Sequence, residues 1–95
     1  MIAVFVKFDA DTLDDERVRK VAAEARAMFE GMPNLRNKFF TLDENNQRAT
    51  NVYVWESEDA ARAFFSDELV ERVTGLYGVR PEIEFAEVLE LVDNS

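Results

Sequence analysis

Hydrophobic periodicity divides the first half of the chain into a strand, a helix and a hairpin. Residues 1–8 alternate but are apolar on both faces, which is typical of a strand covered on both sides. The apolar positions then follow the helical period from a capping-box pattern at 12–15 to a closing Gly31. Residues 35–43 and 48–55 are two β-rich runs joined by a polar turn, which predicts an antiparallel hairpin.

The second half of the chain predicts one more helix and one more strand. Ser57 caps a helix that reaches about Leu76 and is interrupted at Ser66-Asp67. A last strand over 81–92 is again apolar on both faces. The resulting β-α-β-β-α-β order is that of the α+β ferredoxin-like fold, a four-stranded antiparallel sheet with two helices on one face.

Two helices cover only one face of such a sheet, so its second apolar face needs another cover. The chain has no further element to supply it, which favours a two-fold homodimer packed through the open sheet faces, a dimeric α+β barrel. The alternative is an unusually apolar exposed sheet, which would be an aggregation hazard. The length predicts that residues 1–95 form a single domain.

Charge and residue usage exclude several functions. The chain has 20 acidic and 11 basic residues and a net charge of −9, which argues against nucleic acid or an anionic membrane as a partner. It has no Cys and no His, so disulfides, thiolate nucleophiles, sites with Cys or His metal ligands and a Ser-His-Asp triad are excluded. No apolar run approaches the ~20 residues of a membrane span. We therefore expect a soluble protein, and the lack of Cys favours the cytoplasm.

Three short segments carry a resemblance to a known family. They are the Pro33-Asn34-Leu35 start of the second strand, its Lys38-Phe39-Phe40 run, and Val54-Trp55-Glu56-Ser57-Glu58-Asp59-Ala60 after the third strand. Together with the element order, they resemble the dimeric α+β-barrel proteins of the antibiotic-biosynthesis-monooxygenase-like superfamily. The compact form, with a helical break before the last strand, is most similar to the YdhR-type mono-oxygenase branch.

The resemblance implies a pocket between the sheet and the helices of each subunit. Several relatives oxidise anthrones or quinols with O₂ and without metal or flavin, because the substrate carbanion itself activates oxygen. A cofactor-independent monooxygenase acting on a small aromatic molecule, with no cofactor and no metal, is therefore implied. Haem-degrading relatives use an Asn, a Trp and a His; Trp55 matches that Trp, but a chain without His is not expected to degrade haem in that manner.

Two other functions fit the same pattern and stay open. One is a non-catalytic homodimer that binds a small aromatic or apolar ligand, and the other is a subunit-association module with a filled core. A proton-handling group in the pocket separates the enzyme from the ligand-binding protein. Cavity volume between sheet and helices separates both from the association module.

Trp55, Tyr53 and Asn51 are the first candidate site residues, because they share one face of the third strand. Trp55 is either a pocket wall or a core aromatic whose indole N–H bonds a backbone carbonyl. Tyr53 and Asn51 either bind a substrate oxygen, with Tyr53 as a catalytic candidate, or lie on a strand face that is partly exposed to solvent. Tyr77, between two glycines, is either at the pocket mouth or a plain loop residue.

The remaining candidates depend on strand register. Asn37 and Phe39 join the pocket face if Asn37 pairs near Tyr53, whereas a slip of one residue sends them to the opposite face. Lys7, in the middle of the first strand, is either an electrostatic helper that attracts an enolate or phenolate, or the partner of a carboxylate on the last strand such as Glu84 or Glu87. Arg36 and Lys38 are expected to pair with acidic residues of the last strand, Glu82, Glu84 or Glu90, across the dimer.

Two clusters have ordinary structural interpretations. The acids at the first helix start, Asp11, Asp14, Asp15 and Glu16, lack metal-site spacing and are expected to be solvated residues that favour the helix N-terminus. The Phe64-Phe65 pair is expected in the core.

Overall fold

A computed structural model describes residues 1–9, 15–43 and 45–94, with all their side chains except those of Asp15, Leu76 and Tyr77. Asp11 and Asp14, and with them most of the predicted capping box, lie outside the described residues. The elements follow in the order β1 (Ile2–Asp9), α1 (Asp15–Phe29), β2 (Leu35–Asp43), β3 (Arg48–Trp55), α2 (Glu58–Phe64), α3 (Asp67–Tyr77) and β4 (Glu82–Glu87).

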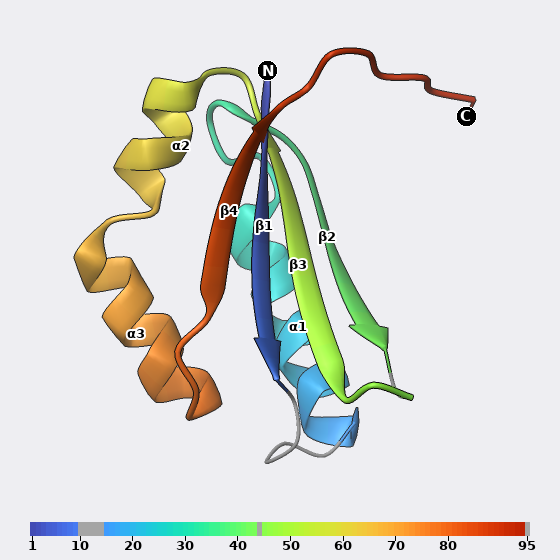
Figure 1. The fold of residues 1–95 in the computed structure, drawn as a ribbon, viewed down its shortest axis with the longest axis vertical. Coiled ribbons are helices and arrows are strands. Elements are labelled where there is room, and N and C mark those ends of the chain that lie inside the picture. Colours follow the sequence, from blue (N-terminus) through green and yellow to red (C-terminus); the bar gives the residue numbers. More distant parts are fainter. Residues whose placement is uncertain (10–14, 44, 95) are drawn as a thin grey trace.

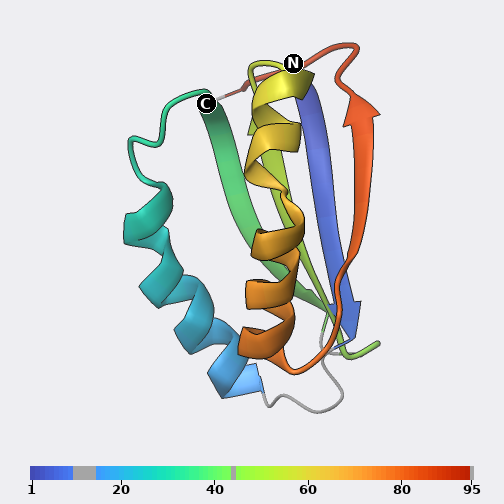
Figure 2. The same ribbon diagram turned by 90° about the vertical axis from the view of Figure 1, so that its left-hand side faces the viewer.

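The four strands form one antiparallel sheet in the order β2-β3-β1-β4 (Figure 1). All three helices lie against the same face of this sheet, and the other face is left open (Figures 1 and 2). The predicted α+β ferredoxin-like architecture is confirmed. Because β1 and β3 are central, they place their helix-facing residues deepest under the helices.

The register of the central pair defines the core. Ile2 lies opposite Trp55, Val4 opposite Tyr53, and Phe8 opposite Ala49 on the helix-covered face. Every second residue of β1 is buried there, and the other residues up to Lys7 are half-buried on the open face. Because the side chains of the strand alternate, one apolar row packs against the helices. The other row, which includes Ala3 and Phe5, lies on the open face.

The interruption predicted at Ser66-Asp67 is confirmed as a break between two helices. The Ser57 hydroxyl accepts a hydrogen bond from the Ala60 N–H at 3.1 Å, and the Ser66 hydroxyl accepts one from the Leu69 N–H at 3.2 Å. Each serine satisfies an N–H that has no partner within the helix. Gly78 closes α3 with φ of 78°, a left-handed conformation that favours glycine.

The last strand is shorter than predicted. The sequence pattern extends it to Val92, but β4 ends at Glu87, which lies opposite Ile2 at the start of β1. The Val88 N–H still bonds the Met1 carbonyl at 3.1 Å, and after that β1 offers no further backbone group. The alternating apolar pattern of the last segment therefore continues past the end of β4. Leu89, which lies in this unpaired part, is 84% exposed.

Two further features bear on the functions considered above. No helix among the described residues is long and apolar enough to cross a membrane. Within the same residues, no group of three or more acidic side chains is placed to hold a metal ion.

Replacement of the Ser66 cap tests the helix break. We expect Ser66→Ala to lower the free energy of unfolding by about 1 kcal/mol, because the Leu69 N–H loses its acceptor. Ser66→Asp is the matched control, since a carboxylate caps equally well and favours the positive end of the helix dipole. Urea unfolding followed by circular dichroism measures both variants, and an equal loss in the two would contradict the capping role.

Candidate functional site

A cavity of about 140 Å³ lies between the sheet and the helices. All four strands and all three helices contribute to its wall, which is mostly aliphatic and aromatic. The polar side chains among the described lining residues are Lys38, Asn51, Tyr53 and Arg72. A cavity of about 150 Å³ lined by apolar side chains can bind benzene, so this volume corresponds to one aromatic ring.

Tyr53 is the centre of the aromatic wall. Its side chain is 6% exposed, and its ring centroid lies 4.9 Å from that of Phe65 and 5.8 Å from that of Phe29, both edge-on. The Phe64 ring lies 5.9 Å away and completes the cluster. Edge-to-face packing at these separations fixes the orientation of a ring. Tyr53 therefore presents a phenol at a defined place in the cavity wall.

Asn51 adds an amide to the same wall. It lies one step along the same face of β3, opposite Val6 of β1 and Phe40 of β2, and is 7% exposed. An amide offers both a donor and an acceptor, so it can recognise a hydroxyl or a carbonyl. The predicted sharing of one face by Asn51 and Tyr53 is confirmed by the register, and both line the cavity.

The structure adds Lys38, which sequence reasoning had placed elsewhere. We expected Lys38 to pair with acidic residues of the last strand across the dimer, but it lies opposite Tyr53 on the helix-covered face, away from the open face. Its Nζ is 3.5 Å from the centroid of the Tyr53 ring, 4.0 Å from that of Phe29 and 4.4 Å from that of Phe40. The sequence held a signal for this placement, because Lys38 continues the alternation of Leu42 and Phe40 along β2.

Burial changes the acidity of this amine. Loss of water around Nζ lowers the pKa of Lys38 from 10.5 to about 7, because the interior disfavours the charged form. The three ring faces oppose this shift, since they attract the protonated ammonium. At neutral pH, Lys38 is thus able both to accept and to donate a proton.

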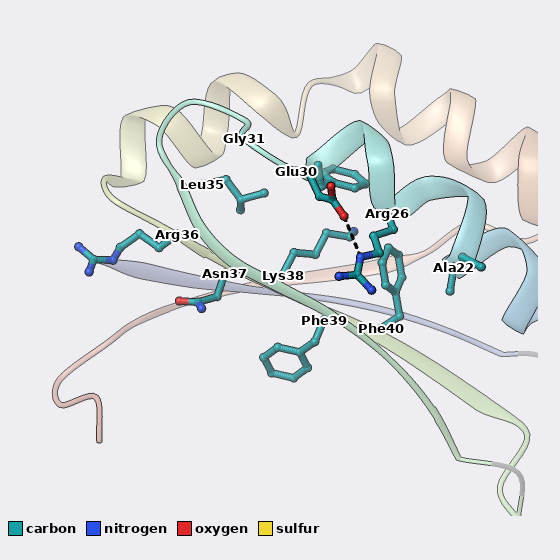
Figure 3. Close-up of a pocket in the computed structure, with 12 residues that line it drawn as sticks. Ala22, Arg26, Glu30, Gly31, Leu35, Arg36, Asn37, Lys38, Phe39 and Phe40 are labelled. Carbon is teal, nitrogen blue, oxygen red and sulfur yellow. Dashed lines mark hydrogen bonds and ion pairs between the residues drawn. The ribbon is translucent and has the colours of Figure 1, made fainter. Parts of the chain in front are cut away.

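Asn37 and Phe39 fall on the other face of the sheet. Asn37 lies opposite Val54 and Phe39 opposite Val52, after an irregularity in the ladder between Leu35 and Asn37. Figure 3 shows both side chains pointing away from the side of β2 that carries Lys38 and Phe40. Phe39 is 50% exposed. Of the two registers considered from the sequence, the structure has the one that keeps these residues out of the inner cavity.

Lys7 also lies on the open face. It stands opposite Thr50, and its Nζ is 3.1 Å from a carboxylate oxygen of Glu84 on β4. Of the two interpretations of Lys7, the ion pair with the last strand is the one that this geometry matches. The sheet separates its amine from Tyr53.

Trp55 lies behind the cavity wall. It is 2% exposed, stacks on Tyr53 with 6.3 Å between ring centroids, and approaches the Phe64 ring to 5.0 Å. The lining of the inner cavity does not include it. Its indole Nε1 is buried without a hydrogen-bond partner among the described residues, in contrast to the backbone bond expected for a core Trp. Tyr77 is the last residue of α3, and its side chain lies outside the described part of the chain.

A second, more open groove of about 610 Å³ runs between α1 and the outer strand β2 (Figure 3). The Arg26 Nε and a Glu30 carboxylate oxygen form an ion pair of 2.8 Å on its helical side. Phe29, Lys38 and Phe40 line both this groove and the inner cavity. These three side chains therefore form the partition between the two spaces.

Comparisons with known proteins bear on the fold. No family model matches the sequence, and no curated protein matches it. Solved structures do match: a monooxygenase from the gene ActVA-Orf6 of Streptomyces coelicolor, in complex with nanaomycin D, is 21% identical with a TM-score of 0.72 over 99% of this chain and 92% of that chain. SnoaB, a cofactor-independent oxygenase from Streptomyces nogalater, is 16% identical with a TM-score of 0.70 over 96% and 95% of the two chains.

A third match is a mutant of MhuD with two manganese protoporphyrin IX molecules in each active site. It is 15% identical, with a TM-score of 0.75 over 99% of this chain and 100% of that chain. At such identities the likeness concerns the fold alone. The antibiotic-biosynthesis-monooxygenase-like fold is therefore confirmed, and the narrower YdhR-type assignment stays a prediction.

The buried amine predicts an unusual pH dependence of stability. Between pH 7 and 10.5 the unfolded chain keeps a proton on Lys38 that the folded chain has released, so folding becomes more favourable as pH rises through this window. Lys38→Met removes this contribution. We expect Lys38→Met to stabilise the protein relative to wild type most at or below pH 7 and progressively less towards pH 10.

Thermal unfolding at a series of pH values measures the difference between the two proteins. Lys20→Met is the matched control, because Lys20 is exposed on α1 and its replacement leaves the cavity unchanged. A constant difference between wild type and Lys38→Met across this range would contradict the lowered pKa.

Proposed function

We propose that this chain is a cofactor-independent monooxygenase that oxidises a small electron-rich aromatic molecule with O₂. The observation that carries the proposal is an aromatic-walled cavity with a buried phenol and amide, Tyr53 and Asn51, in the fold of the oxygenases compared above. The volume of about 140 Å³ favours a single-ring quinol over a three-ring anthrone.

The reaction requires three things of the protein. The substrate must lose a proton, because only its anion is electron-rich enough to reduce O₂ directly. It must be held in one orientation, and bulk water must be kept from the reactive intermediate. The rings of Phe29, Phe64 and Phe65 provide an apolar enclosure, and the polar groups in the wall stabilise charge on the substrate oxygen.

In this proposal, Tyr53 and Asn51 hydrogen-bond the substrate oxygens, and Trp55 supports Tyr53 from behind. Of the two catalytic candidates from the sequence, Lys7 and Tyr53, it is Tyr53 that lines the cavity. Lys7 acts in the ion pair with Glu84 on the opposite face of the sheet. Tyr77 is assigned to the pocket mouth only as a prediction from the sequence.

Oxygen uptake by metal-stripped protein with a panel of hydroquinones and anthrones tests this function. We expect uptake above the buffer rate for single-ring quinols, and a decrease of about a hundred- to a thousandfold in Tyr53→Phe, because a positioned hydrogen bond to developing charge is lost. Trp55→Phe should cause a smaller decrease, since it acts through Tyr53.

Lys20→Met on the exposed surface of α1 is the control and should keep the wild-type rate. A loss in Lys7→Met without a loss in Tyr53→Phe would contradict the assignment of the site. Binding of quinols without any oxygen uptake would favour the non-catalytic ligand-binding protein instead.

We also propose that two copies pack through their open sheet faces. In a single copy this face presents a row of apolar side chains that no helix covers, Ala3, Phe5, Phe39, Val52 and Val54. The half-exposed Phe39 lies on the outer strand, where a facing sheet would bury it. The relation to dimeric α+β-barrel proteins supports the same arrangement.

A carboxylate on this face should separate the copies. We expect light scattering to give about twice the chain mass of 10.9 kDa for wild type and about one chain mass for Phe39→Asp, because a buried unpaired charge opposes association. Ala63→Asp, which adds the same charge to the exposed surface of α2, should remain dimeric. A wild-type particle of a single chain mass would contradict the proposal.

A further inference from the structure

The cavity has a charge opposite to that of the whole molecule. The chain carries 20 acidic and 11 basic residues, yet the described lining of the inner cavity contains two cationic residues, Lys38 and Arg72, and no carboxylate. Acidic side chains are abundant elsewhere, as in the pairs of Lys7 with Glu84 and Arg26 with Glu30. Such a site selects ligands that can become negatively charged.

Lys38 and Lys7 have different surroundings. The Lys38 amine lies over aromatic rings, whereas the Lys7 amine forms an ion pair with a carboxylate. The Nζ of Lys38 lies within 4.4 Å of three ring centroids, and none of the described carboxylates forms an ion pair with it. Rings attract an ammonium but do not neutralise it, so the amine keeps its capacity for an external anion. An ammonium buried without a counter-ion is costly, and a ligand oxyanion would remove that cost.

The place of Lys38 in the wall also matters. Together with Phe29 and Phe40, it lines both the inner cavity and the outer groove and so lies between them. A single ring that fills the inner cavity therefore lies against this partition, and a ligand approaching from the groove meets the same amine. Tyr53, whose ring centroid lies 3.5 Å from Nζ, lines the inner cavity and not the outer groove.

We propose that Lys38 is the proton acceptor and counter-ion for an acidic hydroxyl on a single-ring aromatic ligand. The ligand arrives as a neutral phenol or quinol, its O–H proton moves to the Nζ lone pair, and the resulting phenolate stays paired with the Lys38 ammonium. One O–H bond breaks, one N–H bond forms, and no electron leaves the ligand in this step. The inference rests on the proposed function, for which this transfer is the activation of the substrate.

The lowered basicity of the buried amine supports this step. Because burial lowers its pKa to about 7, Lys38 has a free lone pair at neutral pH. A simple phenol has a pKa of about 10, so the transfer is uphill by itself, and the attraction between the new ammonium and the phenolate has to offset the difference. A carboxylic acid is already ionised in water at neutral pH, so it would have to lose its hydration as an anion before it could pair with the amine. A phenol crosses the apolar wall uncharged and ionises only at the amine, which avoids the cost of desolvating an anion.

The test uses 4-nitrophenol, because its phenolate has a visible absorption band and its nitro group makes it a poor reductant of O₂. Its ionisation is therefore read independently of any oxygenase activity. At neutral pH, where part of the Lys38 amine is unprotonated, we expect wild-type protein to raise the ratio of phenolate to phenol of the bound probe about tenfold over that of the free probe, which is one pKa unit. Lys38→Met should remove this increase.

Two variants and one second probe make the result specific. Lys38→Arg keeps the charge but cannot take up a proton, so it should bind phenolate from solution and lose the pH dependence seen with wild type. Lys20→Met should behave as wild type. The probe 4-nitrobenzoate should bind more weakly than 4-nitrophenol, and its affinity should change less in Lys38→Met.

Several results would overturn the inference: no binding of 4-nitrophenol to folded wild type, an equal phenolate band in Lys38→Met, or tighter binding of the benzoate. Circular dichroism confirms that each variant is folded. Phenolate formation without oxygen uptake would sustain the role of Lys38 and reject the monooxygenase. Oxygen uptake that is unaffected in Lys38→Met, without a phenolate band, would sustain the monooxygenase and reject the role of Lys38.

Discussion

The register between β2 and β3 determines what lies under the helices of this protein. An irregularity between Leu35 and Asn37 shifts the ladder, so that Lys38 and not a neighbour faces Tyr53. Because successive side chains of a strand point to opposite faces, this one placement also sends Phe39 to the open face. The composition of the cavity and that of the uncovered sheet are thus two results of the same pairing.

Two lysines of the same sheet, on opposite faces, show how differently the fold treats one residue type. Lys7 is on the open face and pairs with Glu84 at 3.1 Å, which is the common arrangement for a partly exposed lysine. Lys38 is half-buried on the covered face, with its Nζ over three rings. Desolvation of an ammonium costs several kcal/mol, whereas each ring face contributes about 0.5–2 kcal/mol, so the rings offset only part of that cost. The balance leaves an amine that changes protonation state near neutral pH.

The aromatic cluster links stability to the site. Tyr53 packs against Phe29 of α1 and Phe65 after α2, so the rings that hold the helices on the sheet also form the cavity wall. Trp55 continues this cluster with an indole N–H that has no partner among the described residues, which is a destabilising feature inside an otherwise apolar core. Stabilisation from the same rings outweighs it, since they bury large areas around Trp55. A rigid wall with a few polar groups is the arrangement by which small cavities orient a ligand.

The sequence by itself determined the type and order of the elements, the break at Ser66, and the chemistries that a chain without Cys and His excludes. These follow from local periodicity, capping residues and composition, which need no knowledge of distant contacts. It also indicated that Tyr53 and Asn51 share a face, because their spacing along one strand is fixed. Only the tertiary structure decided that Lys38 enters the cavity and that β4 ends at Glu87. Both depend on pairing with another strand. The placement of Lys38 depends on the shift in the β2–β3 ladder, and the end of β4 depends on where its pairing with β1 stops. Alternation within a single strand carries no information about its partner.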